Sequence, residues 1–158
     1  ATQTTNGINT GAFGDATVLV DLGARTVTYT IRVFNLPSGI TASHIHVGPS
    51  LTAGPVVINF APPVTASNDF SFTGTVKDTE FVLRPDQGIR SADDMFQALL
   101  GGNTYVNVHS QVNPGGEIRG QLTPTAYEAE LSLVRSSLES LSARHWREYL
   151  EAWPAKSS

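Results

Sequence analysis

The sequence of 158 residues contains no cysteine, which excludes a disulfide framework and any metal site built on thiolates. Charged residues make up only 15% of the chain and the net charge is −4, so the basic surface of a nucleic-acid-binding protein is missing. No apolar run is long enough to cross a bilayer, and the first residues lack the two regions of a signal peptide. We expect no nucleic-acid partner and no transmembrane segment; if the protein is exported, the sequence corresponds to its mature form.

Small, β-branched and turn-forming residues are abundant instead, and they predict short strands joined by turns. Apolar side chains alternate with threonines and an arginine over residues 26–33, which is typical of a half-buried strand. Residues 17–22 predict the other strand of a hairpin, and residues 55–60 and 69–76 predict further strands. The chain up to residue 123 therefore reads as an all-β domain.

One segment in this region is helical rather than extended. Ser91 suits an N-cap and Gly101 a helix end, which predicts a short crossover helix between them. Asp93 and Asp94 resemble a catalytic acid pair, but carboxylates in a first helical turn more often complement the helix dipole.

The pattern changes after Pro124. Residues 125–153 contain neither glycine nor proline, and their apolar residues follow helical spacing, which predicts a long amphipathic helix within an extension of residues 124–158. Trp146, Tyr149 and Trp153 crowd its end, and such aromatic residues are enriched in protein interfaces. This helix either packs against the domain or mediates assembly.

Three of the four histidines lie in two predicted strands. Side chains alternate along a strand, so His44 and His46 share one face while Ile45 points to the other. His109 ends a similar segment, in which Val106 and Val108 form the apolar face. Imidazole is a common ligand of copper and zinc, so the three histidines are candidate metal ligands; alternatively, they hydrogen-bond to loops and stabilise the sheet.

The polar neighbours of His109 depend on the strand register. If Val108 pairs with Ile118 across the loop, His109 faces Glu117. The Glu117 carboxylate would then hydrogen-bond to the imidazole and orient it as a ligand without touching the metal itself. Arg119 would lie on the same face, where it would either form a surface ion pair or attract a small anion.

Two motifs resemble the CHRD domain, the family named after chordin. HIHVG at residues 44–48, followed by GPVV at 54–57, resembles the first signature of that family, and YVNVHS at 105–110, followed by PGGEIRGQL at 114–122, resembles the second. The resemblance covers roughly residues 10–123 and implies a Greek-key β-sandwich of the superoxide dismutase-like or Ig-like type. It also implies a secreted, extracellular or periplasmic protein, with a non-enzymatic role in binding or self-assembly.

A looser resemblance links the chain to copper/zinc superoxide dismutase. The approach to the His-x-His pair, residues 36–44, is similar to that of the dismutase copper strand, which implies a copper site of His44, His46 and His109. The zinc loop of the dismutase has no counterpart here, which argues against dismutase activity more than against metal binding. The expected metal is copper, and zinc is less expected. The alternative function is accordingly a copper-binding redox protein.

The start of the chain departs from the CHRD pattern. The opening strand of the family and its GxxEVPP-like segment have no clear match before Gly11. A sandwich that lacks one strand leaves a sheet edge open to a strand from another chain. We therefore expect a homo-oligomer or another protein partner, held through this edge or through the C-terminal helix.

Overall fold

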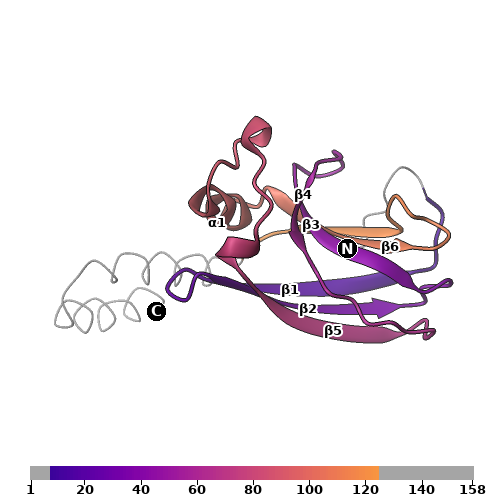
Figure 1. Cartoon of the computed structure of the whole chain (residues 1–158). Helices are drawn as coiled ribbons and strands as arrows, with labels where there is room; N and C mark the ends of the chain where they lie inside the picture. Colours follow the sequence, from indigo (N-terminus) through magenta and orange to yellow (C-terminus); the bar gives the residue numbers. More distant parts are fainter. Residues whose placement is uncertain (1–7, 125–158) are drawn as a thin grey trace, which may run out of the picture.

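The computed structural model describes residues 8–124, and within that range seven strands form two antiparallel sheets packed face to face (Figure 1). One sheet has the order β1-β2-β5 and the other has the order β4-β3-β6-β7. The strands are β1 (Phe13–Asp21), β2 (Thr26–Phe34), β3 (Ile40–Val47), β4 (Val56–Asn59), β5 (Phe70–Lys77), β6 (Thr104–Ser110) and β7 (Ile118–Leu122). The predicted all-β sandwich is confirmed.

The first sheet follows the predicted alternation. Val27, Ile31 and Val33 of β2 are at most 2% exposed, because this face of the strand packs into the core between the sheets. On the opposite face, threonines of β2 and β5 pair across the strands: the hydroxyl oxygens of Thr28 and Thr75 lie 2.9 Å apart. Between β2 and β5, the outer face of this sheet is therefore lined by hydroxyl groups.

The second sheet brings the two histidine segments together. β3 lies between β4 and β6, and His44 pairs with Asn107 while His46 pairs with Tyr105. Ile45 and Val106 point into the core, as predicted. The predicted pairing of Val108 with Ile118 is also confirmed.

The crossover helix is α1 (Ala92–Leu100), which lies between β5 of one sheet and β6 of the other. Ser91 caps it by accepting a hydrogen bond from the Asp94 backbone N–H, as predicted. Met95 and Phe96 are buried in the core. Two short 3₁₀ helices, η1 (Asp78–Glu80) and η2 (Pro85–Gln87), precede α1.

The ends of the chain bear on two further predictions. Residues 8–12 form no strand, so β1 is the first strand in the described range. The predicted C-terminal helix lies outside the described residues. Within residues 8–124, no helix has the length and hydropathy needed to span a membrane.

Candidate metal centre

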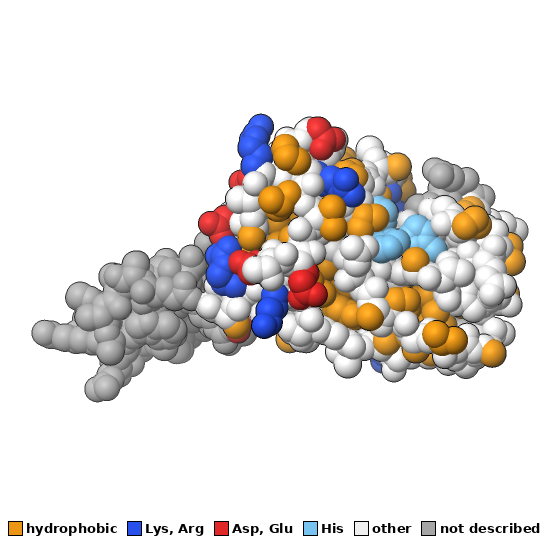
Figure 2. All heavy atoms as spheres, in the orientation of Figure 1, with side chains coloured by type: hydrophobic (Ala, Val, Ile, Leu, Met, Phe, Trp, Pro, Cys, Tyr) orange, Lys and Arg blue, Asp and Glu red, His pale blue; other side chains and the backbone are white. Residues whose placement is uncertain are grey.

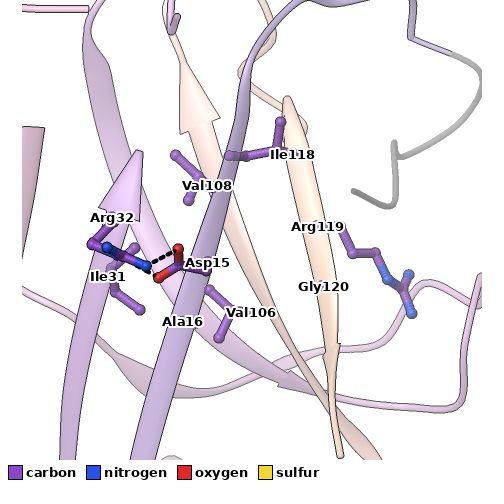
Figure 3. Close-up of a pocket in the computed structure, with 10 residues that line it drawn as sticks. Asp15, Ala16, Ile31, Arg32, Val106, Val108, Ile118, Arg119 and Gly120 are labelled. Carbon is purple, nitrogen blue, oxygen red and sulfur yellow. Dashed lines mark hydrogen bonds and ion pairs between the residues drawn. The ribbon is translucent and has the colours of Figure 1, made fainter. Parts of the chain in front are cut away.

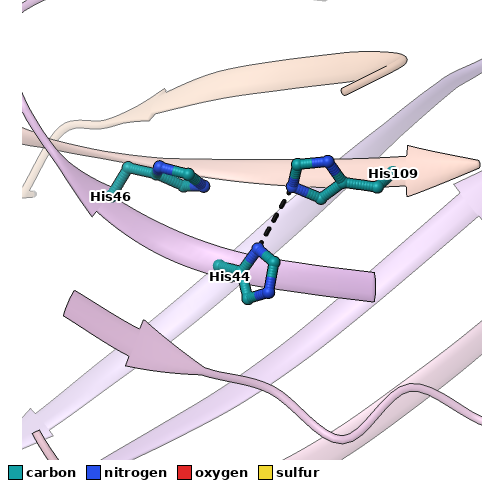
Figure 4. Close-up of side chains that lie close together, drawn as sticks. All are labelled: His44, His46 and His109. Atoms are coloured by element: carbon teal, nitrogen blue, oxygen red, sulfur yellow. Dashed lines mark hydrogen bonds between the residues drawn. The ribbon is translucent and has the colours of Figure 1, made fainter. Parts of the chain in front are cut away.

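The three predicted ligands meet on the outer face of the second sheet. One nitrogen from each of His44, His46 and His109 lies within 4.8 Å of the others (Figure 4). His46 is only 8% exposed, while the other two are half-buried, and together they form a patch at the molecular surface (Figure 2). The sheet register explains the meeting, because His109 lies two residues beyond the cross-strand partner of His44, a diagonal position that side chains can reach.

Two backbone carbonyls determine which nitrogen of His46 and of His109 carries the proton and which is left to bind a metal. His46 Nδ1 lies 2.8 Å from the Gly54 carbonyl oxygen, and His109 Nδ1 lies 2.9 Å from the Pro114 carbonyl oxygen. A carbonyl oxygen can only accept a hydrogen bond, so both Nδ1 atoms carry the proton. In this tautomer, the Nε2 atom of each ring holds the lone pair that a metal needs.

The two lone pairs have different surroundings. His46 Nε2 is buried and has no hydrogen-bond partner among residues 8–124. His109 Nε2 lies 3.1 Å from His44 Nδ1, which donates to it in the absence of a metal. This spacing is close to the roughly 3.3 Å between two nitrogens of a tetrahedral metal site with bonds of about 2.0 Å. A change of tautomer at His44 would supply the third lone pair.

The surroundings of His44 and His46 favour their neutral forms. Burial lowers the pKa of His44 to about 4, and repulsion from His109 and His46 adds to this effect. Burial also lowers the pKa of His46, although its hydrogen bond to Gly54 opposes the shift. Neutral imidazole is the form that binds metals, so His44 and His46 are in the ligand form near neutral pH.

Glu117 lies beside the strand end but turns away from the imidazoles. Its carboxylate accepts hydrogen bonds from Thr10 (2.6 Å) and Ser110, and the side chain is 1% exposed. Burial would raise its pKa, but these bonds and one from Asn113 outweigh it, so that the pKa is lowered. The residue precedes β7, where strand alternation does not set the direction of a side chain, and the Nδ1 partner of His109 is the Pro114 carbonyl instead.

Among residues 8–124, Arg119 forms no ion pair, and its two terminal nitrogens are already occupied. It is 5% exposed, and its two terminal nitrogens donate to the carbonyl oxygens of Thr52 and Pro49, each at 2.8 Å. Its guanidinium carbon lies 3.4 Å from the centre of the Tyr105 ring. The ring of Tyr105 in turn stacks on that of His46, with centroids 4.9 Å apart.

Sequence reasoning did not identify Tyr105 as part of this site. The signal for it was present, since Tyr105 shares a strand face with His109 and lies four residues before it. The loop of residues 48–55 was also missed, although it supplies the carbonyl that orients His46. No periodic pattern marks a loop that contributes only backbone atoms.

Comparison with known proteins gives one family. A model of the CHRD domain matches residues 1–122, which include both histidine segments. No curated protein and no solved structure matches the chain.

Proposed function

This chain belongs to the CHRD domain family, and we propose that it is an exported binding module whose histidine cluster binds one transition-metal ion, copper in preference to zinc. At a coarse level, membership of the family supports a binding role without catalysis. The metal, the export and the contact surfaces are our proposals.

The observation that carries the metal proposal is the unpaired Nε2 atom of His46. A cluster with a purely structural role would satisfy its buried nitrogens, because an unmet buried polar atom costs about 1–3 kcal/mol. Here the atom faces two other imidazoles and has no partner among residues 8–124. A metal ion would use this lone pair together with the two on His109 and His44.

The ligand set favours copper. Imidazole nitrogens bind Cu²⁺ more tightly than Zn²⁺ in the usual affinity order of divalent metals. Within the described part of the chain, the cluster holds three histidines and no carboxylate, so a fourth position would be open to water. Because Arg119 already donates to Thr52 and Pro49, we place copper binding ahead of dismutase-like chemistry, which needs an attraction for a small anion.

Calorimetric titration of the whole chain with Cu²⁺ and Zn²⁺, followed by metal analysis after dialysis, tests the proposal. We expect one equivalent of copper on the native protein and none on the double variant His46→Ala/His109→Ala. His145→Ala is the matched control, because it removes the fourth histidine of the sequence, which is not one of the three proposed ligands. Equal copper affinity of the native and double-variant proteins would refute the metal site.

A second candidate function, self-assembly, is favoured by the edge of β1. Within the described residues, β1 pairs only with β2, and β7 pairs only with β6. A pocket between them is walled by apolar core residues and lies beside the Asp15–Arg32 ion pair (Figure 3). β1 has nine residues without lysine or proline, the features that usually protect an edge, and its outer face exposes Phe13 and Leu19.

We propose that a second copy of the chain adds to this edge. Sedimentation velocity of the whole chain should show a dimer that dissociates in the variant Leu19→Lys, since a charge on the edge opposes strand pairing. Thr73→Lys on the outer face of β5 is the control, because that strand forms the opposite edge of the same sheet. A monomer at all concentrations would refute self-assembly and would leave the metal proposal untouched.

A further inference from the structure

We infer that Tyr105 and Arg119 are positioning residues of the metal centre, which hold His46 in its ligand orientation and favour the Cu⁺ state of bound copper. The inference rests on the proposed function and deepens it, because it concerns the regulation of the same site. It starts from a stack of three planar groups: the imidazole of His46, the phenol ring of Tyr105 and the guanidinium of Arg119.

The stack is closely packed. The planes of the His46 and Tyr105 rings differ by only 9°, and the Arg119 guanidinium covers the Tyr105 ring at 3.4 Å. All three side chains are at most 8% exposed, so little water separates them. Three neighbouring strands supply one group each, since His46 is on β3, Tyr105 on β6 and Arg119 on β7.

The peptide of Gly54 links the stack to the tautomer of His46. Its N–H donates to the Tyr105 hydroxyl at 2.9 Å, and its carbonyl accepts from His46 Nδ1 at 2.8 Å. The Tyr105 hydroxyl also donates to this carbonyl, at 3.3 Å. A Cβ atom at Gly54 would lie 1.7 Å from the Val47 carbonyl oxygen, so only glycine brings the peptide this close. Tyr105 therefore contacts the face of the His46 ring and also holds in place the Gly54 carbonyl, which accepts the hydrogen bond from His46 Nδ1 and so keeps the proton on that nitrogen.

Arg119 binds the loop of residues 48–55 and places a positive charge against the Tyr105 ring. Its donation to Pro49 and Thr52 holds the segment that leads to Gly54, and Gln121 adds a bond of 3.0 Å to the Gly48 carbonyl. Arg119 is paired with no carboxylate among residues 8–124, so its buried positive charge is not neutralised locally. A nearby positive charge destabilises Cu²⁺ more than Cu⁺, because the interaction scales with the charge of the ion.

The test measures copper affinity in both oxidation states by competition with chromogenic chelators, together with the electron paramagnetic resonance spectrum of Cu²⁺. In Arg119→Met, we expect the ratio of Cu⁺ to Cu²⁺ affinity to fall roughly tenfold, which equals about 59 mV in the potential of a one-electron couple. Arg119→Lys retains the charge and should restore most of the ratio. A purely structural role would lower the melting temperature or both affinities alike, and leave the ratio unchanged.

The Tyr105 variants test the positioning role and do not depend on the folding of Arg119→Met. Tyr105→Leu removes the stacked ring and should weaken Cu²⁺ binding at least tenfold and alter the resonance spectrum, whereas Tyr105→Phe retains the ring and should lose less. Equal Cu²⁺ affinities and spectra in Tyr105→Leu and the native protein, or an unchanged ratio in folded Arg119→Met, would overturn the inference. Failure of the native protein to bind copper would instead overturn the proposed function.

Discussion

The two sheets of the sandwich follow the same alternation of apolar and polar residues, but their polar faces differ. In the first sheet, the threonines and the one charged residue of β2 face outward and are exposed or half-buried, as Thr30 and Arg32 show. In the second sheet, the corresponding face carries Tyr105, Asn107 and Arg119, all at most 5% exposed. Polar residues on an exposed face need no partner, whereas buried ones must be satisfied or used. This difference supports our proposal that the outer face of the second sheet is the functional one.

The largest expected effect is a loss of stability when the inner face of either sheet is mutated, and it should be similar for the two sheets. Ile31 of β2 and Ile45 of β3 are at most 2% exposed in one core, so alanine at either site should lower the free energy of unfolding by about 2–5 kcal/mol. Urea denaturation of the metal-free protein measures both. A loss confined to one of the two variants would show that the sheets do not share a core.

The outer faces should differ sharply in metal binding. His46→Ala should weaken copper binding at least about 100-fold. Mutation of a group that only orients a ligand typically lowers metal affinity 10- to 100-fold, and removal of the ligand itself should cost more. Thr28→Ala on the outer face of the first sheet should leave copper affinity unchanged. Titration of the two variants side by side makes the comparison, and a similar loss in both would show that the effect is one of folding.

The metal-free protein should lose stability in mild acid because of His44, which lies on the second sheet. The pKa of His44 is about 4 in the folded state and 6.5 for a free histidine, so the unfolded chain binds the additional proton between these values. Stability from this residue is complete above pH 6.5 and declines as the pH falls towards 4. Urea denaturation across this range should show that the free energy of unfolding declines less steeply with falling pH in His44→Asn than in the native protein. The same pH dependence in both proteins would contradict the lowered pKa of His44.

The smallest effect concerns the threonine pairs of the first sheet. The hydroxyl groups of Thr28 and Thr75 face each other at an exposed position, where cross-strand pairs contribute about 0.2–1 kcal/mol. A double-mutant cycle with valine at each position, followed by thermal denaturation, should give a coupling within that range. A coupling above it would show that the exposed face is more than a solvated surface.

Much of this architecture could be predicted from local sequence patterns. The opposite faces of His44 and Ile45, the helix with its Ser91 cap, and the pairing of Val108 with Ile118 were all predicted and are confirmed. These features depend on neighbours in sequence or on one turn, so local rules determine them. Glu117 and Arg119 were harder to place, because the first precedes its strand and the second bonds to a loop some seventy residues away.

The sequence by itself determined the β-sandwich class, the shared face of His44 and His46, and the absence of thiolate ligands. Only the tertiary structure decided that His109 meets His44 and His46, since this requires β3 and β6, which are far apart in the chain, to be neighbours. It also decided which nitrogens are free, because the Gly54 and Pro114 carbonyls reach the rings only after the loops have folded over the sheet. Side-chain periodicity is a local property, whereas the protonation of a ring nitrogen depends on backbone atoms that no periodic pattern records.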